Sequence, residues 1–180
     1  PEALVASSNI EEVLKGAKQV YIAVPSQTLR DNLQEWGKHI EADAIIVSLM
    51  KGVEQGSGLR MSEVIADVLK IEQDLICVVS GPNLSLEIAS EQPAACVAAC
   101  TSQENAALVA AASTNSYFTT FTNKDVIGTE FGGILKNLIA VAIGIVNGVG
   151  YGQNTKASIM TRGLAEISRF AVAFGAKKKT

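Results

Sequence analysis

The chain has 180 residues, 48% of them hydrophobic, and a mean hydropathy of +0.25, which is typical of a folded chain of one or two domains. Its 15 basic and 18 acidic residues give a net charge of −3, and only 5% of residues are aromatic. The broad basic surfaces and stacking platforms of nucleic-acid binders are therefore not expected. Small molecules are the favoured ligands.

The cysteines and the single histidine limit the kinds of chemistry available. Cys77, Cys96 and Cys100 are an odd number set within apolar runs, which predicts reduced thiols in a cytoplasmic protein. His39 is the only histidine, so histidine-based triads and multi-histidine metal sites are excluded, and no metal is expected. We find no signal-peptide pattern, and glycines and amides interrupt residues 138–156, so no stable membrane insertion is predicted.

Short β-branched runs alternate with helical patterns through the first two thirds of the chain. The predicted strands are residues 19–24, 44–50, 75–80, 94–99 and 117–122. The predicted helices between them are residues 27–40, 60–69, 85–90 and 103–113. This alternation predicts an α/β fold with a doubly wound parallel sheet. Capping boxes are predicted at Ser8 with Glu11 and at Thr101 with Glu104.

The pattern changes near Asn123, after which only long helical segments follow. Residues 126–149 and 155–174 are the two predicted helices. We therefore divide the chain into an α/β part, residues 1–122, and an all-helical part, residues 123–180.

Polar residues follow the predicted strands at the edge where open parallel sheets bind ligands. Lys51 lies in the turn after the second strand, and Asn83 in the turn after the third. Together they offer a charge and hydrogen-bond donors to a phosphate-sized anion. An exposed loop lysine is an equally good explanation of Lys51, and Asn83 also suits a helix N-cap.

The first long helix carries one lysine in an otherwise apolar, glycine-rich segment. Steps of four residues give a row that is small everywhere except at the lysine: Gly128, Gly132, Lys136, Ala140, Gly144 and Gly148. The row predicts a close approach to this side of the helix, with Lys136 pointing into the space. A crowded lysine has an adjustable pKa and can transfer protons. The alternative is a lysine that extends its ammonium to the surface.

Several long stretches resemble the bacterial-type NAD(P)-dependent glycerol-3-phosphate dehydrogenases. They are "IAVPSQTLRDNL", "MKGVE", "VVSGPNLSLEIA" and the block from "NKDVIGTEFGGILKN" to "TRGLAEISRF". The resemblance implies that residues 1–122 are the C-terminal part of a Rossmann-type dinucleotide-binding domain and that residues 123–180 are the start of an all-helical substrate domain. It implies an enzyme that interconverts dihydroxyacetone phosphate and sn-glycerol 3-phosphate by hydride transfer with NAD or NADP. It also implies a cytoplasmic enzyme of glycerophospholipid metabolism, supplying lipid biosynthesis, and leaves room for a homodimer.

The resemblance also implies roles for individual residues. Lys136 falls on the catalytic lysine, which donates a proton to the carbonyl oxygen and takes it back in the reverse reaction. The implied substrate-binding residues are Lys51, Gly81, Asn83, Lys136 and Asn137. The implied cofactor-binding residues are Pro25, Lys51 and Ser85.

Two other interpretations fit much of the same pattern. One is a related dehydrogenase that acts on hydroxyacids, and the other is a scaffold protein without turnover.

The glycine-rich turn of dinucleotide-binding proteins is not found in this chain. No G-x-G-x-x-G precedes a predicted helix, since "GVGYGQN" follows one instead. The family's glycine-rich strand-turn-helix would precede Pro1, and further substrate residues would follow Thr180. We therefore expect the isolated piece to bind cofactor weakly and to be inactive.

Overall fold

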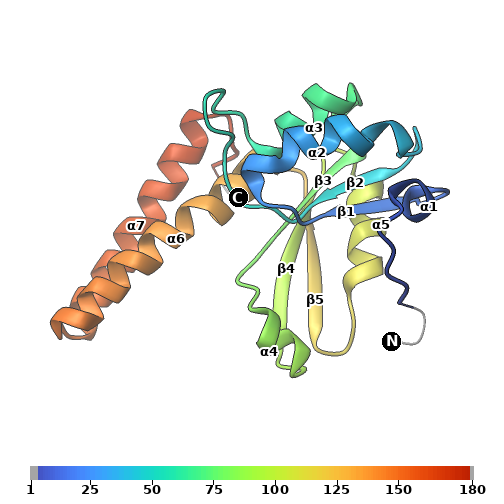
Figure 1. The fold of residues 1–180 in the computed structure, drawn as a ribbon. Helices are drawn as coiled ribbons and strands as arrows, with labels where there is room; N and C mark the ends of the chain where they lie inside the picture. Colours follow the sequence, from blue (N-terminus) through green and yellow to red (C-terminus); the bar gives the residue numbers. More distant parts are fainter. Residues whose placement is uncertain (1–3, 179–180) are drawn as a thin grey trace.

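A five-stranded sheet forms the centre of the computed structural model, which describes residues 4–178 (Figure 1). The strands follow one another in chain order across the sheet: β1 (Gln19–Ile22), β2 (Ile45–Ser48), β3 (Ile76–Ser80), β4 (Ala94–Ala99) and β5 (Phe118–Asn123). All five predicted strands are confirmed. The α/β, Rossmann-like class of the fold is confirmed as well.

The sheet is mixed, whereas the sequence predicted parallel strands throughout. β1, β2 and β3 are parallel, β4 and β5 are parallel, but β3 and β4 are antiparallel. The connection between β3 and β4 contains only the five-residue helix α4 (Ser85–Ala89). At 1.5 Å per residue such a helix spans roughly 7 Å, too little to return along a strand and start a parallel one. The chain therefore turns back at the end of β3.

Helices cover both faces of the sheet and divide the core in two (Figure 1). On one face, α2 (Leu29–Trp36) and α3 (Met61–Leu69) pack over alternate strand residues such as Ile46 and Ile76. On the other, α5 (Gln103–Ser113) packs over their neighbours Val47 and Cys77. Both sets are buried because successive strand residues point to opposite faces. The remaining short elements are α1 (Ile10–Leu14), η1 (Ser26–Thr28), η2 (Gly37–His39) and η3 (Gln73–Leu75).

Both predicted capping boxes are wrong by one residue. Asn9, not Ser8, caps α1 and accepts from the Glu12 backbone N–H. Ser102, not Thr101, caps α5 and accepts from Asn105 N at 3.2 Å. In each pair a neighbouring polar residue competes for the cap, and sequence alone does not decide between them.

The last third of the described chain is a helical hairpin that projects away from the sheet (Figure 1). α6 (Val126–Val149) starts against β3 and β4, and α7 (Gln153–Ala173) runs back beside it. Three aromatic rings pack where the two helices meet near the sheet: Phe131, Phe170 and Phe174. The Lys177 backbone N–H then donates to Asp125 Oδ2 at 2.6 Å, which brings the chain back to the start of α6.

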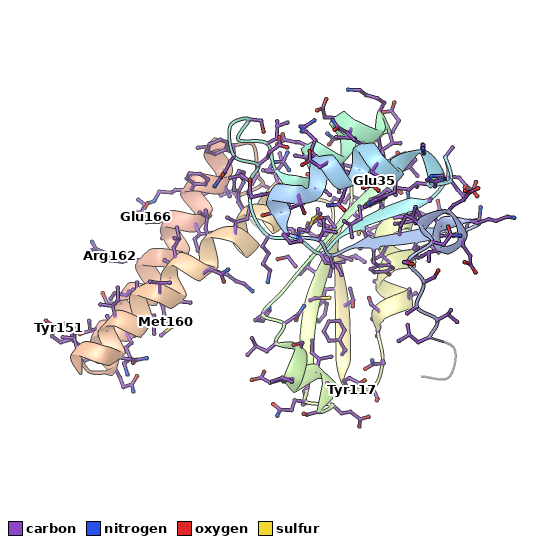
Figure 2. The ribbon with its side chains drawn as sticks, in the orientation of Figure 1. Glu35, Tyr117, Tyr151, Met160, Arg162 and Glu166 are labelled. Atoms are coloured by element: carbon purple, nitrogen blue, oxygen red, sulfur yellow. The ribbon has the colours of Figure 1, made fainter. Side chains whose placement is uncertain are left out.

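Much of the hairpin surface is exposed and apolar. Figure 2 shows Tyr151 at its tip and Met160 on α7, and their exposed fractions are 59% and 50%. α6 is long and apolar enough to cross a membrane by length and composition, and 11% of its most apolar window is buried. Long core helices of soluble proteins pass the same test. The prediction of no stable membrane insertion therefore stays a prediction.

Candidate active site

Two lysines from separate elements converge on one backbone oxygen. Lys136 Nζ, from α6, donates to the Gly81 carbonyl oxygen at 2.6 Å, and Lys51 Nζ, from the loop after β2, donates to the same oxygen at 3.3 Å. Gly81 itself directly follows β3. The structure thus brings together three of the residues that the sequence selected for the site.

The position of Lys136 depends on how α6 meets β3. Asp125 caps the helix by accepting from Gly128 N at 3.0 Å. Two turns along, a Cβ at Gly133 would collide with Ser80 Oγ, so a larger residue would require Ser80 or the helix to shift. Lys136 follows after three residues and reaches the Gly81 carbonyl. Its side chain is half-buried, which contradicts the surface alternative.

Three members of the predicted four-residue row, Gly128, Gly132 and Lys136, line one pocket, but the closest contacts of the helix with other protein atoms lie elsewhere. A Cβ at Gly132, Gly144 or Gly148 would meet nothing within 4 Å among the described residues. The tight positions are Gly133 on α6 and Gly163 on α7, where a Cβ would collide with the Ile139 side chain. Glycine spacing therefore identified the helix and the side of it that faces the pocket, but not the positions of closest protein contact.

The loop that carries Lys51 is fixed against the start of α2. Gln27 Nε2 donates to the Val53 carbonyl oxygen at 2.8 Å, and Gln55 N donates to Gln27 Oε1 at 2.9 Å. Arg30 adds a two-bond contact to Glu54, at 2.8 and 3.0 Å. The loop residue Lys51 is exposed, yet the turn around it is held by these contacts.

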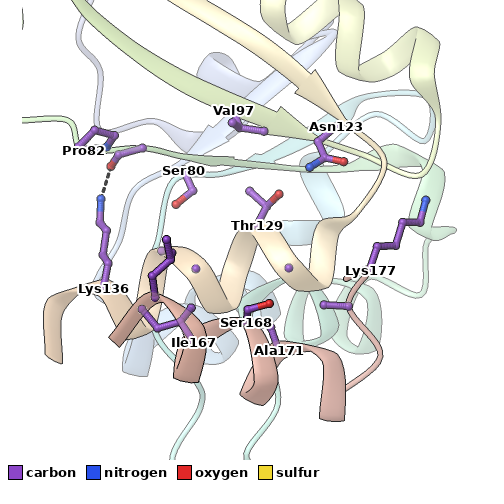
Figure 3. Close-up of a pocket in the computed structure, with 16 residues that line it drawn as sticks. Ser80, Pro82, Val97, Asn123, Thr129, Lys136, Ile167, Ser168, Ala171 and Lys177 are labelled. Carbon is purple, nitrogen blue, oxygen red and sulfur yellow. Dashed lines mark hydrogen bonds between the residues drawn. The ribbon is translucent and has the colours of Figure 1, made fainter. Parts of the chain in front are cut away.

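A pocket of about 410 Å³ adjoins the Lys136 amine, between the helical hairpin and the ends of the strands. Figure 3 shows Lys136 reaching from α6 toward the segment that carries Pro82, while Lys177 lies at the opposite end. The sheet side contributes Ser80, Val97 and Asn123, and the helices contribute Thr129, Ile167 and Ser168. The lining is small and largely apolar, so few groups besides the amines can bind charge.

Burial and a neighbouring cation both act on Lys136. Burial disfavours the charged amine and lowers its pKa, and the positive charge of Lys51 lowers the pKa further. An ammonium with a lowered pKa gives up its proton more readily near neutral pH. The arrangement therefore suits proton transfer to an oxygen placed where the two amines meet.

The other predicted residues are not drawn together with the lysines. Asn83 is not the cap of α4, because Leu84 is the N-cap and no side chain caps that helix. Instead, Asn83 Oδ1 is buried without a hydrogen-bond partner among the described residues. Pro25, Ser85 and Asn137 are exposed, and no described side-chain hydrogen bond links them to Lys136. Residues 4–178 contain no cluster of three side chains that could hold a metal.

Sequence reasoning missed several pocket residues. Ser80 ends β3, and the rule that the carboxyl ends of parallel strands bind ligands could have selected it. Asn123 ends β5, which runs antiparallel to β3, so that rule does not select it. Ser168 and Lys177 could not be selected, because their place depends on how α7 folds back over α6. A buried acid in α6, Glu130, was also missed, although it stands out in an apolar helix.

Comparison with known families agrees with this geometry. Residues 1–106 match the family model described as NAD-dependent glycerol-3-phosphate dehydrogenase N-terminus, and residues 125–180 match its C-terminus counterpart. The chain belongs to this family. The earlier resemblance is thereby confirmed.

Curated relatives and solved structures give the same result. Glycerol-3-phosphate dehydrogenase [NAD(P)+] of Leifsonia xyli is 59% identical over the whole chain, which covers 49% of that protein. The Corynebacterium glutamicum protein of the same name is 54% identical over the whole chain, which covers 54% of it. Glycerol-3-phosphate dehydrogenase from Coxiella burnetii superimposes with a TM-score of 0.90 at 32% identity, covering 99% of this chain and 54% of that one. The chain thus spans about half the length of these relatives.

Proposed function

We propose that the full-length protein is an oxidoreductase that interconverts dihydroxyacetone phosphate and sn-glycerol 3-phosphate with NAD or NADP. The observation that carries this proposal is the convergence of Lys136 and Lys51 on the Gly81 carbonyl oxygen beside a pocket. It supports the reaction because a ketone oxygen needs a proton donor, and a phosphate needs a cation. The relatives named for this activity add support.

Lys136 is the proposed proton donor and acceptor. In reduction its ammonium donates a proton to the ketone oxygen as the carbonyl becomes an alcohol, and in oxidation the neutral amine takes the proton back. The Gly81 carbonyl holds the ammonium in place before substrate binds, which limits the reorganisation that the reaction requires. Lys51 contributes a second positive charge, which stabilises negative charge developing on the oxygen.

The residues present fit part of a nicotinamide cofactor, which when bound supplies or accepts the hydride. Asn83 Oδ1 is a buried acceptor without a donor, and Lys51 is an exposed cation, both beside the strand ends. The cation suits an anionic part of a ligand, whereas the acceptor oxygen suits a ligand group that donates a hydrogen bond, such as a hydroxyl or an amide. We propose Pro25, Lys51 and Ser85 as the cofactor contacts of this chain. The G-x-G-x-x-G turn that binds a pyrophosphate between a strand and a helix does not occur in residues 4–178.

Further parts of the proposal concern the substrate site and the whole protein. Gly81, Asn83 and Asn137 join the two lysines as substrate contacts. Residues 1–122 act as the dinucleotide-binding part and residues 123–180 as the start of the substrate domain. The enzyme is cytoplasmic, without stable membrane insertion, pairs as a homodimer, and supplies glycerol 3-phosphate for phospholipid synthesis.

Replacing Lys136 tests the function directly. In the full-length protein, Lys136→Ala should lower the turnover of dihydroxyacetone phosphate by about 10²- to 10⁴-fold, the usual contribution of an acid-base group. The exposed Lys15 offers a matched control, and Lys15→Ala should retain normal turnover. Circular dichroism should show both variants folded. Near-normal turnover of Lys136→Ala would reject the assignment.

Activity on substrates with and without a phosphate distinguishes the proposed function from the two alternatives, a hydroxyacid dehydrogenase and a scaffold protein without turnover. Removing the phosphate from the ketone should abolish most activity, because the substrate then lacks the anion that positions it in a cationic site. A hydroxyacid dehydrogenase would instead turn over short hydroxyacids without phosphate. A scaffold protein would be folded and inactive toward both substrates at full length.

A further inference from the structure

Glu130 is a buried acid in a helix that is otherwise apolar around it. Its side chain is 4% exposed. Glu130 Oε1 accepts from the Ser62 backbone N–H at 3.0 Å, and Oε2 accepts from Ser62 Oγ at 2.6 Å and from Arg60 Nη1. Every described donor to this carboxylate therefore comes from the start of α3, about 70 positions earlier in the chain.

The donors of Glu130 belong to the far end of the loop that begins at Lys51. That loop closes through the pairing of Val53 with Arg60, and Glu54 N donates to the Leu59 carbonyl oxygen at 2.8 Å. Arg60 also pairs with Glu63 at 2.9 Å, so it is fixed on two sides. A group bound to Arg60 and Ser62 is thereby bound to the base of the Lys51 loop.

Glu130 and Lys136 lie on the same helix, six residues apart, which is about 9 Å along the axis. Between them Gly133 lies against Ser80 at the end of β3. α6 is thus held at two points before it reaches Lys136: at the loop base by Glu130 and at the strand end by Gly133. Because the helix is rigid over this length, fixing these two points also fixes the position of Lys136.

Burying a carboxylate in this contact is unfavourable in free energy, because the charge loses its hydration. Burial raises the pKa of Glu130, although the serine and arginine donors oppose that rise. An apolar pair of similar size often stabilises a core as well or better. Hydrogen bonds, however, fix direction and register, which apolar packing does not.

We propose that Glu130 is a positioning residue, whose contacts with Arg60 and Ser62 hold α6 and the Lys51 loop in the one register that places both lysine amines on the Gly81 oxygen. This inference rests on the proposed function for its catalytic consequence, but not for its geometry. A carboxamide at position 130 loses the charge that pairs with Arg60, and its NH2 group takes the place of one carboxylate oxygen and faces Arg60 Nη1, which can only donate. The helix and loop then shift relative to each other.

The test measures turnover and amine proximity separately in the full-length protein. Glu130→Gln should lower kcat about 10- to 100-fold, as expected for a displacement of roughly an ångström, while KM for the cofactor changes little. Treatment with 1,5-difluoro-2,4-dinitrobenzene, which joins amines that lie close together, should link Lys51 to Lys136 in the wild type, as read by mass spectrometry. In Glu130→Gln the yield of that link should fall several-fold.

Three further variants serve as controls for the effect of Glu130→Gln. Glu166→Gln makes the same change in an exposed α7 ion pair with Arg169, and it should alter neither the link nor kcat. Glu130→Asp retains the charge and should recover part of both. If Glu130→Gln does not fold, Ser62→Ala, which removes one donor, should show a smaller loss in the same direction.

One kind of result would refute the positioning role of Glu130, and a different result would refute the proposed function. Folded Glu130→Gln with wild-type link yield and wild-type kcat would refute the positioning role, as would unchanged Ser62→Ala if Glu130→Gln is unfolded. A wild-type protein that forms the link but has no turnover would refute the proposed function while the link yields still decide the role of Glu130.

Discussion

Gly133 of α6 lies against Ser80 of β3 so closely that any side chain on the glycine would overlap the serine hydroxyl. The next residue after Ser80 is Gly81, whose carbonyl oxygen accepts from both lysines. The contact therefore sets the distance between the helix that carries Lys136 and the strand end that receives it. The small size of Gly133 thus contributes to the geometry of the candidate site.

Valine at position 133 should push the helix away from the strand. We expect Gly133→Val to lower the free energy of unfolding by about 1 to 3 kcal/mol, the usual cost of overpacking. Gly132→Val is the matched comparison, because its Cβ would meet nothing within 4 Å. It should be neutral or slightly stabilising, since valine is the better helix former. Urea unfolding of the full-length variants measures the difference, and equal stabilities would contradict the contact.

Local patterns predicted the elements well and their long-range relations poorly. α6 begins at Val126 and ends at Val149 as predicted, because one apolar run and a clear stop determine both ends. The antiparallel β4 and the buried partners of Glu130 were not predicted. Both depend on segments that meet only after folding. Lys136 could be selected because it is a charged residue in an otherwise apolar helix. Ser168 could not, because α7 carries many polar residues and nothing in the sequence sets this one apart.

The charge of Lys51 should be visible in the pH dependence of the reaction. Burial and Lys51 both lower the pKa of Lys136. In ketone reduction Lys136 must be protonated, so turnover falls as pH rises through that pKa. Lys51→Met removes the repulsion, so the Lys136 pKa should rise and the alkaline fall in kcat should move to higher pH. Rate profiles of the full-length enzyme measure this, and an unmoved or lowered limb would contradict the coupling.

Arg30 should contribute stability that depends on acid pH. Its hydrogen bonds lower the pKa of Glu54 and of Asp67. Lowered carboxyl pKa values give stability that is present above the ordinary values, about pH 4, and is lost as pH falls through the folded ones.

Arg30→Met should therefore lower the thermal midpoint at pH 6 by more than it does at pH 3. The exposed pair of Lys18 with Asp43 provides the control, since pairs at the surface contribute little. Lys18→Met should change the midpoint far less at pH 6. A loss of equal size at both pH values would show that Arg30 acts through packing alone.

The cysteines should be unreactive until the protein unfolds. All three are buried, and burial raises the pKa of Cys77 to about 12 and raises those of Cys96 and Cys100. Alkylation requires the thiolate, which is scarce at pH 8 under these conditions. Iodoacetamide should leave the peptides that carry these residues unmodified in the native full-length protein, and should modify all three in urea. Rapid modification of native Cys77 would show that the sheet face covered by α5 opens in solution.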